Sequence, residues 1–184
     1  MRLTWQTWLE QCLLVGLAML LYLALFELNA WTLTSLEHAP GVNWIFLPAG
    51  LRVFLVLILG APGALGLVLG TWAIDLLRGA PWTTGLFLNG LVSGLMPWLL
   101  RLGLERLRLF PQDLRDLHWP ALSRYVLLYA LLNALAHQTA WQLTGWRASL
   151  VWVDIWPMVV GDLAGALIVI GLWRLLLQRR TSML

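Results

Sequence analysis

Long apolar blocks alternate with short polar or glycine- and proline-containing breaks along almost the whole chain. Blocks of about 20 apolar residues are long enough to cross the hydrocarbon core of a bilayer as α-helices. The pattern predicts an all-α fold, a single polytopic transmembrane bundle with about six helices at residues 8–28, 43–59, 61–77, 82–100, 120–143 and 151–177. The second and third helices are short, so five or seven spans are the alternatives.

Composition agrees with a membrane protein. Of the residues, 60% are hydrophobic and 11% are charged, whereas a soluble domain carries about 25% charged residues. The basic residues are 12 Arg and no Lys, and they lie beside the apolar blocks. In that position they orient helices in the bilayer. We therefore expect the chain to contact a lipid bilayer and to bind no nucleic acid.

The arginines also predict the orientation. With the N-terminus inside, the inner side holds nine of them, namely Arg2, Arg101, Arg106, Arg108, Arg115, Arg124, Arg174, Arg179 and Arg180. The outer side holds Arg78 and Arg147, and Arg52 lies within the second helix. Positive residues are enriched on the cytoplasmic side of membrane proteins. Both termini and the 101–119 loop are thus predicted to be cytoplasmic, in a bacterial inner membrane.

Polar side chains at membrane depth are the informative residues, because such groups usually face the bundle interior or a wet cavity. The orientation places nearly all of them in the outer half. We expect them to converge on a pocket that opens toward the periplasm, built from Arg52, Asp162, Asp75, Glu27, Asn89, Asn133, His137 and Trp156. Asp162 is the preferred counter-charge of Arg52, with Asp75 or Glu27 next. A ligand or ion pocket, a purely structural clamp and a proton path are the alternatives.

Proline and glycine predict special backbone features. Pro48, followed by Gly50, is expected to kink or unwind the second helix near Arg52,. Glycines four residues apart, such as Gly161 and Gly165, form a flat strip that lets two backbones approach closely. Such strips serve packing inside one chain or association into a homo-oligomer.

Enzyme motifs are missing from the sequence. It has no Walker loop, no paired-histidine metal motif, no cysteine cluster and no Gly-x-Ser-x-Gly elbow,. The serines lack an evident neighbouring base, and His137 is expected to serve as a hydrogen-bonding strut or a proton sensor. We expect no enzyme activity, no cofactor and no metal.

Two stretches resemble the first class of bacterial membrane-associated sensor domains, the MASE family. One is Asn-Trp-Ile-Phe-Leu-Pro-Ala-Gly-Leu-Arg at residues 43–52, and the other is Gly-Asp-Leu-Ala-Gly at residues 161–165. Leu47 stands where the family has Trp before the proline. Family domains have about eight helices and precede a kinase or a cyclic-di-GMP enzyme. The resemblance implies a short stand-alone sensor without an output domain.

Three functions follow as expectations. The first is a non-enzymatic membrane sensor or accessory subunit, which acts through a separate membrane or cytosolic partner protein. The second is a small-solute-binding component of a transporter, since such subunits have a similar length and helix number. The third is a structural subunit of a larger membrane complex.

Overall fold

The computed structural model describes residues 5–148 and 150–181, and the side chains of residues 6–148 and 150–175. Arg2 and the side chains of Arg179 and Arg180, which entered the orientation argument, lie outside that description. Within it the chain forms six α-helices: α1 (Trp5–Thr32), α2 (Leu47–Leu59), α3 (Ala61–Leu77), α4 (Thr84–Arg106), α5 (Trp119–Thr144) and α6 (Val151–Thr181). The predicted all-α class is confirmed. A small hairpin of β1 (Glu37–Ala39) and β2 (Val42–Asn43) follows the 3-10 turn η1 (Thr34–Leu36), and a second turn, η2 (Leu114–Asp116), precedes α5.

Three of the described helices are long and apolar enough to cross a membrane, over Gln6–Thr32, Thr84–Arg106 and Val151–Leu175. The α2 and α3 helices are shorter but also apolar. Large apolar side chains cover the outside of the bundle, as lipid contact requires, including Leu13, Leu65 and Leu167. A multi-pass membrane protein fits these features, while six full crossings stay a prediction.

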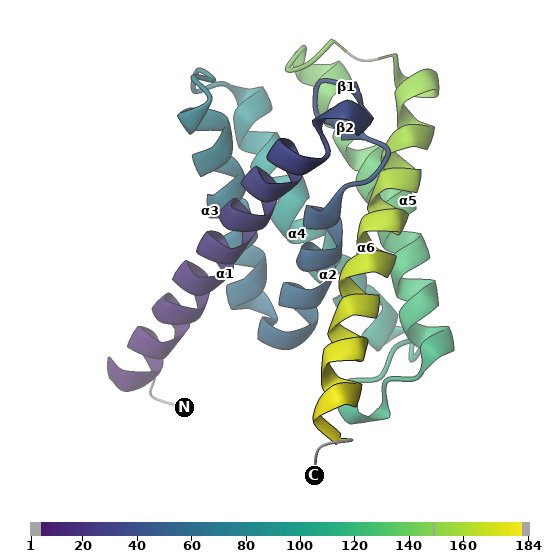
Figure 1. The fold of residues 1–184 in the computed structure, drawn as a ribbon. Helices are drawn as coiled ribbons and strands as arrows, with labels where there is room; N and C mark the ends of the chain where they lie inside the picture. Colours follow the sequence, from purple (N-terminus) through teal and green to yellow (C-terminus); the bar gives the residue numbers. More distant parts are fainter. Residues whose placement is uncertain (1–4, 149, 182–184) are drawn as a thin grey trace.

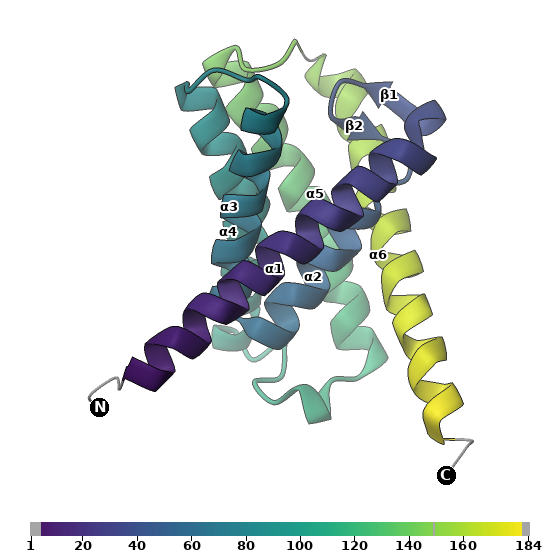
Figure 2. The ribbon, with the colours of Figure 1, turned by 60° about the vertical axis from the view of Figure 1, so that its left-hand side comes forward.

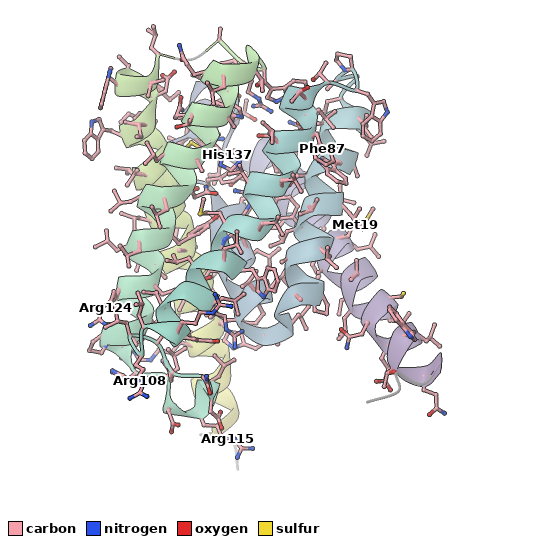
Figure 3. All side chains as sticks on the ribbon, turned by 180° about the vertical axis from the view of Figure 1, so that it is seen from behind. Met19, Phe87, Arg108, Arg115, Arg124 and His137 are labelled. Atoms are coloured by element: carbon pink, nitrogen blue, oxygen red, sulfur yellow. The ribbon has the colours of Figure 1, made fainter. Side chains whose placement is uncertain are left out.

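The helices run between two ends of different character (Figure 1). Both termini and the α4–α5 connection lie at one end, and the hairpin with the α3–α4 and α5–α6 connections lies at the other. Figure 3 shows Arg108, Arg115 and Arg124 gathered at the end that holds the termini. Helix α2 contacts α1, α3, α4 and α6 and so occupies the middle. Figure 2 shows α1 crossing the bundle diagonally, and α1 and α6 diverge toward the termini.

Residues 43–46 are not helical, in contrast to the prediction. After β2 the chain bends at Trp44 and Ile45, and α2 begins only at Leu47. Pro48 therefore lies in the first turn of α2, where a proline removes no intrahelical hydrogen bond. The prediction that Pro48 kinks or unwinds the second helix is thus wrong. Tertiary partners satisfy the non-helical backbone: the Phe46 N–H donates to the Gly161 carbonyl at 3.1 Å, and the Leu47 N–H donates to Asn29 Oδ1 at 2.9 Å.

Glycines on α6 make room for residues 43–46. A Cβ at Gly161 would collide with the Asn43 carbonyl, and a Cβ at Gly165 would collide with the Phe46 carbonyl. A Cβ at Gly50 would in turn meet the Gly165 carbonyl oxygen. The glycine strip of α6 thus contacts this non-helical segment and the start of α2. Non-helical backbone at membrane depth is tolerated where protein buries it in this way.

The connection between α4 and α5 is shorter than predicted, because α4 continues to Arg106. Arg101 consequently belongs to the helix and not to a loop. Its Nη1 donates to the carbonyls of Val56 and Leu57 at 2.9 and 2.8 Å, and its Nε donates to Glu105 at 2.7 Å. The Val56 carbonyl also accepts from the Gly60 N–H at 3.0 Å, whereas the last carbonyls of a helix otherwise lack intrahelical partners. Arg101 thus caps the end of α2 from a neighbouring helix.

Candidate functional site: a charged cavity between the helices

A cavity of about 520 Å³ reaches into the bundle from the hairpin end. Exposed residues at its mouth include Glu37, Pro40 and Arg78, which lie at the end opposite the termini. The buried part of its wall comes from α1 to α6 and carries Tyr22, Asn29, Arg52, Thr71, Asp75, Asn89, Ser93, His137, Trp141 and Asp162. Five of the residues predicted for the pocket therefore line one cavity: Arg52, Asp75, Asn89, His137 and Asp162.

Arg52 is the deepest cation of this cavity, and its side chain is held by neutral groups. Its Nε donates to the Tyr22 hydroxyl at 3.1 Å, its Nη2 donates to the same hydroxyl, and Nη2 also donates to Ser93 Oγ at 3.2 Å. The guanidinium lies over the rings of Tyr22 and Phe46, with centroid distances of 5.2 and 5.3 Å. An arginine stays charged in any protein environment. The site thus presents a fixed, buried positive charge.

Ser93 connects Arg52 to His137. His137 Nδ1 lies 3.0 Å from the Asn133 carbonyl oxygen, which can only accept, so Nδ1 carries the proton in the neutral ring. His137 Nε2 then accepts a hydrogen bond from Ser93 Oγ at 3.2 Å. The statement that the serines lack a neighbouring base is wrong for Ser93, because folding places His137 of α5 beside it. The view in Figure 3 shows His137 inside the half of the bundle that lies away from the termini.

Asp162 does not form the ion pair expected with Arg52. Within the described residues no carboxylate lies at ion-pair distance from Arg52. Instead, Asp162 Oδ2 accepts a hydrogen bond from Asn133 Nδ2 at 2.6 Å, and its side chain is buried. Hydrogen bonds from α1 and α4 hold Arg52, whereas a hydrogen bond from α5 holds Asp162. The two charges therefore face one cavity without contact.

A second polar cluster lies nearer the mouth. Asp75 accepts hydrogen bonds from Asn89 Nδ2 at 2.8 Å and from Arg147 Nη2 at 3.4 Å. Trp141 Nε1 donates to Asn89 Oδ1 at 3.0 Å, and the Arg147 guanidinium lies over the Trp141 ring at 5.1 Å. Burial lowers the pKa of Arg147, and the neighbouring carboxylate of Asp75 opposes that shift. This cluster closes on itself, so its charges are already compensated.

Three residues of the predicted pocket lie elsewhere. Glu27 is exposed and pairs with Arg78 at 3.1 Å on the rim. Asn133 does not line the cavity, but its side chain donates to Asp162 and its backbone carbonyl accepts from His137. Trp156 is 63% exposed on the outside of α6, because six helical positions place it about 120° around the axis from Asp162.

Several cavity residues escaped the sequence reasoning. Tyr22 precedes Asn29 by seven positions, which puts both on one face of the apolar α1, and Ser93 follows Asn89 by four positions, which puts both on one face of α4,. Those spacings were the available signals. Arg147 and the hairpin residues gave none, because they come from connections whose path the sequence does not define. Among the residues with described side chains, no group of three or more His, Cys, Asp or Glu could hold a metal ion.

Comparison with known proteins finds no relative. No protein-family model matches the chain, and no curated protein and no solved structure matches it. The cavity itself therefore has to support any functional proposal.

Proposed function

We propose that this chain is a multi-pass protein of a bacterial inner membrane that binds a small polar solute in the cavity from the periplasmic side. In this proposal it is a non-enzymatic sensor or accessory subunit, which signals through a separate membrane or cytosolic partner. One observation carries the proposal: Arg52 and Asp162 line the same cavity as buried charges, yet neither forms a direct ion pair with the other or with another described residue.

The cost of these charges supports a role beyond packing. Insertion scales give about 2.5–3.5 kcal/mol for an arginine or an aspartate at the centre of a membrane helix. A structural clamp offsets that cost by direct contact between the two charges. Here neutral donors keep Arg52 and Asp162 apart, and the space beside them is about 520 Å³. Ligand pockets have volumes of about 300–1,000 Å³, so the cavity is large enough for a small solute.

Arg52 connects the cavity to helices that reach the other end of the bundle, so a solute could change their arrangement. Arg52 lies on α2, whose other end is capped by Arg101 of α4, and α2 packs along α6, which runs to the end with the termini. A solute that binds to Arg52 would pull on its side chain and shift α2 relative to α4 and α6. The resemblance to membrane-associated sensor domains favours the same proposal.

A second candidate, a solute-binding transporter component, has one observation in its favour. Helix α2 begins only after the non-helical segment 43–46, which lies against the glycines of α6. Interrupted helices beside a midplane binding site are typical of secondary transporters. Both candidates require the same cavity, and they differ in the partner.

Thiol accessibility tests the cavity and its direction. In a Cys12→Ser background, Thr71→Cys places a thiol on the cavity wall, and Val68→Cys places one on the same helix in the buried core, away from the cavity. A membrane-impermeant cationic thiosulfonate added to spheroplasts should modify the Thr71→Cys thiol and leave the Val68→Cys thiol unmodified. Equal protection of both thiols, or reaction only after the cytoplasmic side is exposed, contradicts the proposal.

Co-purification tests the partner. Extraction of the Cys12→Ser chain in a mild detergent, followed by mass spectrometry, should recover a stoichiometric protein partner. A kinase or a cyclic-dinucleotide enzyme favours the sensor, and an ATPase with a coupling membrane subunit favours transport. A chain that runs alone, without partner or bound small molecule, contradicts both and leaves the structural-subunit alternative.

A further inference from the structure

We propose that the solute is a zwitterion with a carboxylate and an ammonium group, of the α-amino-acid type. This inference rests on the proposed function, since it names the chemical class that the same cavity binds. Three observations lead to it: the anion-binding end at Arg52, the cation-binding end at Asp162, and the charge balance of the whole lining.

The anion-binding end is the Arg52 guanidinium. Its hydrogen bonds to Tyr22 and Ser93 fix its position without neutralising it. A planar guanidinium matches a carboxylate in a bidentate geometry. A dianionic phosphate is a poorer match, because the remaining arginines of the lining are already engaged, Arg147 with Asp75 and Arg78 with Glu27. One free positive charge suits one carboxylate.

The cation-binding end is the Asp162 carboxylate. Its described hydrogen bond comes from the neutral amide of Asn133 and reaches Oδ2. Its side chain is buried from bulk solvent but belongs to the cavity wall. A buried carboxylate needs a positive partner or several hydrogen-bond donors. A primary ammonium group supplies both, because it carries one charge and three donors.

The charge balance of the lining leaves one charge of each sign in its depth. Three arginines and three acids line the cavity, namely Arg52, Arg78, Arg147, Glu37, Asp75 and Asp162. Arg147 pairs with Asp75, Arg78 pairs with Glu27 on the rim, and Glu37 is exposed at the mouth. A zwitterion can pair with the two charges that remain, Arg52 and Asp162. Phe26, Ile74 and Met158 also line the cavity and leave an apolar wall for the rest of the solute.

The test uses the full chain in lipid nanodiscs and matched analogues. The panel consists of the common L-α-amino acids, each compared with the carboxylic acid that lacks its amino group and with the amine that lacks its carboxylate. Removing one member of a buried charge pair weakens binding by about 30-fold or more. At least one amino acid should therefore bind that much more tightly than both of its analogues, as measured by calorimetry.

Two variants assign the ends of the solute. Asp162→Asn should make the amino acid and its carboxylic acid bind equally, and Arg52→Gln should do the same for the amino acid and its amine. Thermal melting in nanodiscs shows which variants remain folded. If a variant does not fold, the comparison of analogues on the wild-type chain still decides the proposal.

The outcomes separate this inference from the proposed function. Protection of the Thr71→Cys thiol by sugars or phosphate esters, but by no amino acid, overturns the zwitterion and retains a solute-binding cavity. A carboxylic acid that binds as tightly as its amino acid has the same consequence. A Thr71→Cys thiol that never reacts from the periplasm overturns the proposed function and the zwitterion together.

Discussion

The contact between residues 43–46 and α6 can be tested by adding a single methyl group. Gly165→Ala would place a Cβ against the carbonyl of Phe46 and 3.0 Å from the Leu47 nitrogen, and backbone atoms cannot rotate away as a side chain does. Inserting an extra methyl group into a packed interior costs about 1–3 kcal/mol. The same change gains up to about 1 kcal/mol of helix propensity. Because the added Cβ would overlap the Phe46 carbonyl itself, the packing cost should lie in the upper half of that range, and the net expectation is a destabilisation of about 1–2 kcal/mol.

A matched control lies on the same helix. A Cβ at Gly171 would meet nothing within 4 Å, so Gly171→Ala should keep only the gain in propensity. In a chain of this size 1 kcal/mol shifts the melting temperature by about 2–4 °C. We therefore expect Gly165→Ala to melt about 2–8 °C below the wild type, and Gly171→Ala to melt at or above it. Tryptophan fluorescence in one detergent provides the measurement. Equal or higher stability of Gly165→Ala compared with Gly171→Ala refutes the packing described for residues 43–46.

Three further predictions concern the polar contacts. Arg101→Gln leaves the last carbonyls of α2 without their charged donor, and the free energy of unfolding should fall by about 1.5–3 kcal/mol; an unchanged melting curve contradicts the capping role. Asp75→Asn leaves the half-buried Arg147 without its carboxylate and should lower stability by about 1.5–3 kcal/mol. Glu27→Gln on the exposed rim should change it by less than about 1 kcal/mol; equal effects of the two variants on thermal melting refute the difference in burial. A fluorophosphonate probe should leave Ser93 unlabelled by mass spectrometry, because its side chain is buried and a backbone carbonyl, not a carboxylate, orients the His137 ring beside it,. Stoichiometric labelling refutes the non-enzymatic proposal.

The helices could be predicted because lipid imposes a simple requirement on sequence. A spanning segment must be apolar and must satisfy its own backbone, so apolar blocks translate into helices. The prediction failed at residues 43–46, where Ile45 and Phe46 continue the apolar block. Apolar content alone cannot distinguish a helix from a buried non-helical segment. The distinction depends on the Gly161 carbonyl and the Asn29 side chain, which come from α6 and α1.

The candidate site could be predicted as a set of residues but not as a set of contacts. Exclusion from lipid brings Arg52, Asp75, Asn89, His137 and Asp162 to one cavity, whatever the order of helices. The individual partners depend on the rotation of each helix about its axis and on side chains that look unremarkable in the sequence. Tyr22 and Ser93 are such side chains. They hold the Arg52 guanidinium, which an argument from charge alone would pair with Asp162.

The separation of Arg52 and Asp162 is the feature that a purely structural account explains least well. If stability alone had shaped this region, apolar side chains or a direct ion pair would give a more favourable free energy of folding. Replacing buried charges with apolar groups is often neutral or stabilising. The fold instead uses Tyr22, Ser93 and Asn133 to keep two opposite charges apart beside an open volume. Charges that are already fixed in place, in a site shielded from bulk water, need no reorganisation when a solute binds. Little of the binding free energy is therefore lost to ordering the site. The same hydrogen bonds that prevent the ion pair thus prepare the cavity for a solute that carries both charges.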